Sequence, residues 1–259
     1  MVTKTPAARN TLRVLKLLAS RKSPTPAAMI ATLLQLPRSS VYQLLTEMVD
    51  QGFAIHYPKE QAYGLGLSAF ELSSAYTRQE PLARLGAPLV AQLVDQVGEC
   101  AHLAVLHGAD VLYIVEERAK SRPSLVTDVG VRLPSHLTAS GRAILSKLPK
   151  SQVRALYPRA SDFISRGSNE ATISDYASLR RELLLAEERG YAIEQGDVTA
   201  DFHSLAIAIL DSSNWPVAAL AVTFLADSSG AAERERHEKI LGPLRETAHL
   251  LSERFHGRR

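Results

Sequence analysis

Hydrophobic side chains recur every three or four residues over the first fifty positions, and this spacing predicts a series of short amphipathic helices. The first helix is expected over residues 9–20, where the apolar stripe consists of Leu12, Leu15 and Leu18. A second helix is expected to begin with Thr25 as its N-terminal cap and Pro26 in its first helical position. Pro37 ends this helix and leaves only a tight turn before the next one.

A third helix is predicted from Arg38 to Asp50, because its apolar residues fall within about 100° of arc on a helical wheel. These residues are Val41, Leu44, Leu45 and Met48. Two short helices joined by a tight turn, the second exposing polar side chains near its start, are the parts of a helix-turn-helix. The polar face would then contact DNA through Arg38, Ser39, Ser40, Tyr42, Gln43 and Thr46.

These side chains have the chemistry that the major groove of duplex DNA requires, and that groove admits one helix. Gln43 can pair with adenine and Arg38 with guanine, while the hydroxyl groups reach phosphates or bases. For an isolated helix, a merely solvated surface would be the simpler explanation of the same pattern.

The residues after the third helix favour the DNA-binding interpretation. Residues 53–57 alternate as a strand, residues 58–61 can turn, and residues 62–65 can return as a second strand. A β-hairpin in this place makes a winged helix-turn-helix, with Lys59 at the tip of the wing beside a phosphate. Arg9 completes the predicted set of DNA-contacting residues.

The rest of the chain mixes strand and helix patterns without a regular βαβ alternation, which indicates an α+β body. Residues 67–98 read as helical with a break near residues 79–81, so a linker helix is expected over residues 67–80. The predicted domains are therefore a DNA-binding domain over residues 1–66 and a larger domain over residues 81–259. Within the larger domain we expect strands at 100–107, 111–117, 205–211 and 217–225, and helices at 172–189 and 231–255.

Composition narrows the class of protein. The chain has 259 residues, of which 46% are hydrophobic and 22% charged, as in a globular protein. Its longest apolar stretch, Val217 to Ala226, is too short for a bilayer span of about twenty residues, and the start of the chain has no apolar signal segment. Cys100 is the only cysteine, so disulfides and cysteine-built zinc sites are not expected, and a cytoplasmic location fits.

Charge is distributed unevenly along the chain. Residues 1–65 hold eight Lys and Arg against three acidic residues, a net charge of +5, whereas the remaining 194 residues hold 22 basic and 24 acidic ones, a net charge of −2. A basic module in front of a nearly neutral body favours contact with a polyanion such as DNA. A solvated basic face is the alternative.

Taken together, the motifs resemble the IclR family of bacterial transcriptional regulators. The matching segments are residues 9–15, LPRSSVYQLL at 36–45, YGLG at 63–66, HLAVL at 102–106, VGVRLPSHLTASGRAIL at 129–145, RGYAIE at 189–194, and the strand pair near 205–211 and 217–224. The resemblance implies a GAF-like effector-binding domain behind the linker helix. It also implies homodimers or dimers of dimers that bind palindromic operators and commonly control catabolic operons.

The candidate effector site lies where small residues open a helix near Ala139, Ser140 and Gly141. Free backbone N–H groups at a helix start are a natural seat for a carboxylate, although a plain helix cap would explain the same residues. The resemblance implies that the pocket uses these amides together with Glu194, Ser204, and apolar walls near Leu125 and Phe202. A small carboxylic or aromatic acid is therefore the expected effector.

Several neighbouring positions bear on this site. His203 precedes Ser204 on a strand, so its side chain should face away from that of Ser204. Arg142 could bind an anionic effector, but a structural ion pair is the favoured interpretation. The chain departs from the family pattern at Gln195-Gly196-Asp197, at Asp201 and at Ala206-Ile207-Ala208, so the effector's identity does not carry over.

The main rival is an enzyme, with a C-terminal hydrolase domain behind a vestigial DNA-binding module. Residues 138–142 resemble a nucleophile elbow, but the glycine two positions before Ser140 is missing. Cys100 opens an apolar strand and is expected as a small core residue. No catalytic residue, cofactor or metal is therefore predicted, and the sequence favours a regulator, with repression as the expected mode.

Overall fold

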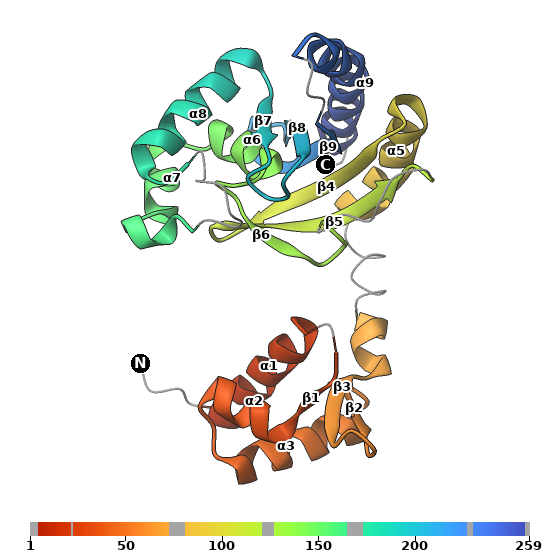
Figure 1. The fold of residues 1–259 in the computed structure, drawn as a ribbon, viewed down its shortest axis with the longest axis vertical. Helices are drawn as coiled ribbons and strands as arrows, with labels where there is room; N and C mark the ends of the chain where they lie inside the picture. Colours follow the sequence, from red (N-terminus) through yellow and green to blue (C-terminus); the bar gives the residue numbers. More distant parts are fainter. Residues whose placement is uncertain are drawn as a thin grey trace. The chain divides into compact units, whose positions relative to one another are not determined.

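The computed structural model describes residues 5–21, 23–72, 81–120, 127–164, 173–226 and 230–256. The chain divides into two compact units, Met1–Gln79 and Glu80–Arg259, which are called unit 1 and unit 2 below (Figure 1). Residues 67–72 are helical, and the rest of the predicted linker helix, 73–80, lies outside the described residues. No helix among the described residues has the length and apolar character needed to cross a membrane.

Unit 1 is a helix-turn-helix followed by a wing. Its elements are α1 (Pro6–Ala19), β1 (Thr25–Pro26), α2 (Ala27–Leu34), α3 (Arg38–Asp50), β2 (Ala54–Tyr57) and β3 (Ala62–Leu65). The strands pair antiparallel in the order β1-β3-β2. Because three helices and the sheet each contribute apolar side chains, the unit has its own core around Val14, Ile30, Val41 and Leu45, all of them fully buried.

Two details of unit 1 differ from the prediction. Leu12 is 59% exposed, and the buried stripe of α1 runs instead through Val14 and Leu18, one helical turn apart. Thr25 does not cap α2: it pairs with Tyr63 of the wing in β1, while Pro26 occupies the N-cap position without a side-chain hydrogen bond. Pairing with a strand far along the chain has therefore replaced the local cap.

Unit 2 is built on one antiparallel sheet with the strand order β6-β5-β4-β9-β8-β7. Its strands are β4 (Cys100–His107), β5 (Asp110–Arg118), β6 (Arg132–Pro134), β7 (Ala192–Gln195), β8 (Phe202–Leu210) and β9 (Pro216–Leu225). Its helices are α5 (Pro81–Val97), α6 (Ala139–Lys147), α7 (Lys150–Leu156), α8 (Tyr176–Arg189) and α9 (Gly230–His256), with a short 3-10 helix η1 (Ala160–Asp162). This mixture confirms the α+β class.

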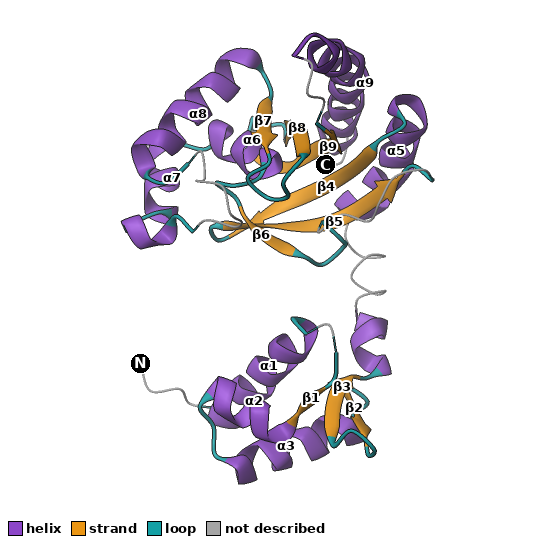
Figure 2. Ribbon diagram, in the orientation of Figure 1, coloured by secondary structure: helices purple, strands orange, loops and turns teal. Residues whose placement is uncertain are grey.

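Helices cover both faces of this sheet (Figure 2). α5 and α9 pack on one face, against a core that includes Leu103, Leu205 and Leu220. α6 packs on the other face, with α8 beside it. Alternation along the strands sends the neighbouring residues of β4, β8 and β9 to this second face, where a small-residue core around Ala104 and Ala206 lies under α6.

The predicted elements of unit 2 are present, with shifted ends. α8 begins at Tyr176, because Asp175 caps it by accepting a hydrogen bond from the Ser178 amide at 2.7 Å; the predicted start, Thr172, lies outside the described residues. Gly190 ends α8 in the left-handed conformation, as expected. The short elements β6, β7 and α7 were not predicted.

Candidate functional site

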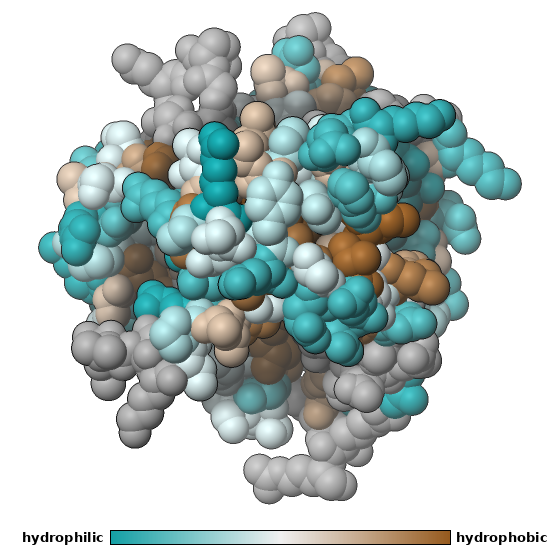
Figure 3. Space-filling model, turned by 90° about the horizontal axis from the view of Figure 1, so that it is seen from below, coloured by the Kyte–Doolittle hydropathy of each residue, from teal (hydrophilic) through white to brown (hydrophobic). Residues whose placement is uncertain are grey.

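The outward face of α3 carries most of the predicted DNA-contacting residues. Val41, Leu45 and Met48 are buried under the helix, so the opposite face is left to solvent. Exposed side chains there are Arg38, Ser39, Tyr42, Gln43 and Thr46, and Ser40 is half-buried. In the view of Figure 3, hydrophilic side chains are interspersed with side chains of intermediate hydropathy and with smaller apolar patches.

The first turn of α3 has no side-chain cap, and this leaves its backbone amides open to an anion. Its N-cap residue, Pro37, provides no side-chain hydrogen bond to the first turn of α3. The amides of a helix start therefore remain available to a phosphate, and the helix dipole favours one. The Thr46 hydroxyl already donates to the Tyr42 carbonyl at 2.9 Å, so it can only accept from a partner.

The wing and α1 supply further basic residues. Lys59 is exposed in the turn between β2 and β3, as predicted, and the Gln61 amide group supports that turn by donating to the Pro58 carbonyl at 2.9 Å. Arg9 is exposed on α1. Arg13 has a structural role instead, because it donates to the Leu34 carbonyl at the end of α2 at 2.8 Å.

The second site is a cavity in unit 2 between the sheet and the start of α6. Its volume is about 20 Å³, which is room for about one water molecule. Its wall combines side chains from β4, β5, β7, β8 and β9 with the first turn of α6. The lining residues are His102, Tyr113, Thr127, Thr138, Ala139, Ser140, Glu194, Val198, Thr199, Phe202, Ser204, Ala221 and Thr223.

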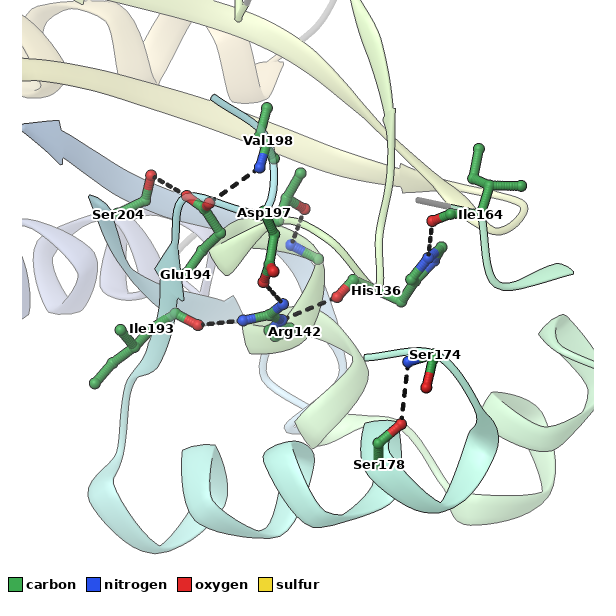
Figure 4. A network of polar contacts seen from close by, with 12 residues as sticks. His136, Arg142, Ile164, Ser174, Ser178, Ile193, Glu194, Asp197, Val198 and Ser204 are labelled. Carbon is green, nitrogen blue, oxygen red and sulfur yellow. Dashed lines mark hydrogen bonds and ion pairs between the residues drawn. The ribbon is translucent and has the colours of Figure 1, made fainter. Parts of the chain in front are cut away.

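Glu194 is the buried acid of this cavity, with 3% of its surface exposed. Its carboxylate accepts hydrogen bonds from the Val198 amide at 3.1 Å and from the Ser204 hydroxyl at 3.0 Å (Figure 4). Ser204 in turn contacts the Thr223 hydroxyl at 2.9 Å. Burial raises the pKa of Glu194 above its ordinary value, although these hydrogen bonds and Arg142 oppose the shift.

The other titratable side chains of the cavity are held neutral. Burial lowers the pKa of His102 to about 4, and its Nε2 atom lies 2.6 Å from the Thr127 hydroxyl. Burial also raises the pKa of Tyr113 well above its ordinary value, against hydrogen bonds with Ser140 and Thr138. His102 and Tyr113 therefore add no charge to the cavity at neutral pH, and Glu194 is the remaining carboxyl group of its lining.

The first turn of α6 is capped by its own sequence. The Thr138 hydroxyl accepts a hydrogen bond from the Gly141 amide at 3.0 Å, so that amide is not free for a ligand. A Cβ atom at Gly141 would overlap the backbone of Ser135, which explains why a glycine stands here. Gly141 is therefore a packing residue and does not line the cavity.

Arg142 forms a structural network beside the cavity, as the sequence favoured. Its guanidinium is buried, pairs with the Asp197 carboxylate, and donates to the carbonyls of His136 at 2.9 Å and Ile193 at 2.7 Å (Figure 4). The network ties α6 to β7 and to the segment after it. Because Asp197 neutralises the charge of Arg142, this arginine is already committed and does not face a ligand.

The structure brings together five of the seven predicted effector residues. Ala139, Ser140, Glu194, Phe202 and Ser204 all line the cavity. Gly141 lies next to it, and Leu125 is outside the described residues. His203 faces away, as predicted: its Nδ1 atom lies 2.6 Å from the Glu233 carboxylate on α9, on the other face of the sheet.

Residues missed by sequence reasoning come mostly from the sheet. His102, Tyr113 and Thr223 each point into the cavity from a different strand. Thr223 had a usable signal, because it is the single polar residue of the longest apolar stretch. Cys100 is buried, as expected for a core residue. In the part of the chain that the structure describes, no three His, Cys, Asp or Glu side chains gather into a metal site.

Comparison with known proteins connects both units to one family. Residues 7–55 match the IclR helix-turn-helix domain, and residues 74–253 match the bacterial transcriptional regulator IclR C-terminal domain. The Pca regulon regulatory protein of Pseudomonas putida is 30% identical over 213 residues, which cover 82% of this chain and 72% of that protein. The HTH-type transcriptional repressor AllR of Klebsiella pneumoniae is 27% identical and covers 85% of this chain and 78% of its own.

The fold is shared with solved structures. An IclR homolog from Microbacterium hydrocarbonoxydans, complexed with 4-hydroxybenzoate, matches with a TM-score of 0.79 at 23% identity, over 95% of this chain and 98% of that one. The likeness extends through unit 2 and fits the GAF-like architecture expected for the effector domain.

Proposed function

Because the chain belongs to the IclR family of bacterial transcriptional regulators, we propose that it represses a catabolic operon and that a small organic acid controls it. The observation that supports DNA binding is the outward face of α3. Its polar and basic side chains are exposed, and the start of the helix has no side-chain cap. Relatives that are named as a repressor and as a regulon regulator support the same role.

In this proposal α3 lies in the major groove of duplex DNA. Gln43 and Arg38 read base edges, Ser39, Ser40, Tyr42 and Thr46 contact bases or phosphates, and Lys59 and Arg9 contact the backbone. A homodimer, or a dimer of dimers, would place two such helices on the half-sites of a palindromic operator. Half-sites on one face of DNA lie about 34 Å apart, so the spacing between the two helices decides whether both can dock.

The effector is proposed to bind in the cavity of unit 2, with its carboxylate on the amides of Ala139 and Ser140. Glu194 would then share a proton with the ligand, since its raised pKa makes the neutral acid accessible. The present volume of about 20 Å³ does not hold an organic acid, so the wall must rearrange on binding. A structure of the same fold with 4-hydroxybenzoate supports an aromatic acid as one candidate.

The switch would be mechanical. Rearrangement of the cavity wall moves α6 and β7, which the Arg142 network ties together. That movement would reach unit 1 through residues 67–80, predicted as a linker helix, and change the separation of the two α3 helices in the dimer. An error of a few ångströms then prevents simultaneous docking on both half-sites.

The test combines promoter DNA with a ligand screen. We expect the purified protein to bind a DNA fragment from its own promoter region more tightly than random DNA when both are measured at the same salt concentration. Small carboxylates and aromatic acids are then screened for a rise in Tm, because a ligand selective for the native state stabilises it. The acid that raises Tm should also shift the DNA-binding curve; binding without any such shift would contradict the proposed control.

A hydrolase with a vestigial DNA-binding module is the rejected alternative. The named relatives are regulators, and Ser140 makes its contact with the neutral Tyr113 and not with a histidine base. We infer that the protein is not an enzyme and that it works in the cytoplasm, where operator DNA lies. Turnover of a small ester or metabolite by the purified protein, without promoter binding, would overturn this inference.

A further inference from the structure

A second hollow lies on the α6–α8 side of unit 2, and it is much larger than the central cavity. It encloses about 470 Å³ between α6, the start of α7, α8 and the turn that joins β8 to β9. None of its lining residues belongs to the central cavity. We call it the lateral groove. Its volume falls in the range of about 300–1,000 Å³ that is typical of small-molecule sites.

Apolar side chains form one part of the lateral groove and remain open to solvent. Trp215 is 41% exposed and Leu184 is 48% exposed, and Tyr176 is half-buried. Large apolar side chains gathered in one hollow differ from apolar residues scattered over a surface, and they mark binding sites. Arg154 already stacks on the Tyr176 ring at 4.5 Å, which leaves the Trp215 indole as the ring available to a ligand.

The backbone of Trp215 is held in place by hydrogen bonds within the β8–β9 turn. The Asp211 carboxylate accepts hydrogen bonds from the amides of Ser213 at 2.8 Å and Trp215 at 2.9 Å. The Asp211 amide in turn donates to the Trp215 carbonyl at 2.9 Å. These hydrogen bonds fix the backbone that carries the indole, so this part of the site is ordered before binding and the entropic cost of binding is lower.

Positive charge forms the other part of the groove. Lys147, Lys150 and Arg180 line it, and all three are exposed. Within the described ranges, none of them takes part in an ion pair. Glu187 is the acidic residue of the lining, so the groove keeps an excess of cations. Unpaired cations beside an apolar wall complement a molecule with an anionic head and an apolar body.

We propose that the lateral groove is a second ligand site, which binds a small organic anion with an apolar body, either an aromatic ring or a medium-length alkyl chain. The apolar body packs on Trp215 and Leu184, and the carboxylate lies among Lys147, Lys150 and Arg180. The site is independent of the proposed central effector site, because the two share no residue. α6 nevertheless contributes to both, with Ala139 and Ser140 at its start and Lys147 at its end.

Fluorescence provides the test, since Trp215 is the chain's single tryptophan. Phenylacetate and octanoate are titrated into the full-length protein up to about 10 mM, well above the dissociation constant of a weak ~1 mM site. We expect a saturable change in Trp215 emission with both acids. Phenylacetamide and octanamide, which lack the charge, should bind at least about fivefold more weakly. Equal responses to acids and amides would refute recognition of the anion.

Variants locate the site. The double variant Lys147→Ala/Arg180→Ala is expected to weaken both acids about tenfold, since each exposed cation contributes up to about fivefold. The matched control is Arg181→Ala/Lys239→Ala, which removes the same charge from exposed residues outside the groove. Both variants should keep the wild-type Tm, because all four side chains are exposed.

Every other outcome overturns the proposal. A response that survives the groove variant would come from elsewhere, with the central cavity as the first candidate. An equal loss in the control variant would mean that overall charge, and not this groove, attracts the acids. No emission change with either acid would mean that the groove does not take small organic anions. None of these results depends on whether the protein responds to an effector on DNA.

Discussion

The α3 face and the central cavity hold their polar groups in opposite states. On α3 the polar side chains are exposed, and the first helical turn has no side-chain cap. In the cavity the polar groups are buried and already satisfy one another, as Glu194 does with Ser204 and Val198. The exposed groups of α3 exchange hydrogen bonds to water for those of a partner, whereas the cavity must exchange hydrogen bonds within the protein for those of a ligand.

In unit 1, the side chains proposed to bind DNA are not those that stabilise the fold. In unit 2, the side chains around the cavity also stabilise the fold. Substitutions on the α3 face would remove the proposed contacts with DNA and leave the core of unit 1 intact. Substitutions around the cavity disturb a network that also holds α6 and β7 in place. Four predictions test this contrast, beginning with the one expected to be largest.

The largest effect is expected for Arg142→Met. The substitution keeps much of the side-chain volume but leaves the Asp197 carboxylate buried without its cation. Loss of one partner of a buried pair costs about 3–5 kcal/mol of unfolding free energy, which urea denaturation measures. The exposed pair of Lys239 and Glu235 provides the control, because Lys239→Ala should cost less than about 1 kcal/mol. Similar losses of unfolding free energy in Arg142→Met and Lys239→Ala would contradict the difference between the buried network and the exposed surface.

The second prediction concerns the outward face of α3. Gln43→Ala should weaken binding to the operator by about 1–3 kcal/mol and relax base preference at one position, with no change in Tm. Electrophoretic or anisotropy assays on the operator and on single-base variants measure this. Gln51→Ala is the matched control, since Gln51 follows the helix and is hydrogen-bonded to Glu47 at 3.1 Å. An equal loss of affinity for all DNA sequences would show that Gln43 does not contact a base.

A smaller effect is expected at the wing. Lys59→Ala should weaken all DNA sequences alike, by about 1 kcal/mol, and reduce the slope of log affinity against log salt by about one unit. The slope is measured between low and physiological salt with operator and random DNA. Lys239→Ala in unit 2 serves as the charge-matched control. If the slope stays at its wild-type value, Lys59 does not contact a phosphate.

The smallest effect is a pH dependence from the cavity. Because burial raises the pKa of Glu194, the folded state holds this proton more tightly than the unfolded state does. Its contribution to stability is complete below the ordinary pKa of a glutamate and is lost as the pH rises through the higher folded value. Relative to Glu194→Gln, the wild type should therefore lose a small part of its unfolding free energy as the pH rises above the ordinary pKa of a glutamate.

Denaturation at several pH values checks this slope for both proteins. The comparison cancels the other titrating groups, which the two proteins share. A wild type that gains stability over the same interval, relative to the variant, would show that hydrogen bonds and Arg142 dominate the pKa of Glu194 and that burial does not.

The same contrast explains what the sequence could and could not predict. The bounds of α3, Arg38–Asp50, follow from apolar periodicity within thirteen residues, a local property. The position of Thr25 in β1 depends on pairing with Tyr63 in the wing, which no local pattern contains. β6 and β7 are three and four residues long, too short for alternation to distinguish them from loops.

The cavity shows this limit most clearly. Ala139, Ser140, Glu194, Phe202 and Ser204 were named through a family resemblance, and the structure places all of them in the lining. His102, Tyr113 and Thr223 were missed, because their common cavity depends on the register of β4 against β5 and β9. Register between distant strands follows from packing of the whole sheet and is not written in any one strand.

The short outer strands of unit 2 also bear on its solubility as a folded body. A sheet that exposes a long unpaired edge invites a strand from another molecule, which is how edge-to-edge aggregation begins. Here β6 offers only Arg132–Pro134, with a proline that lacks an N–H group. At the opposite edge, the Ile193 carbonyl of β7 is already occupied by the Arg142 guanidinium. Both margins of the six-stranded sheet thus resist the addition of a foreign strand.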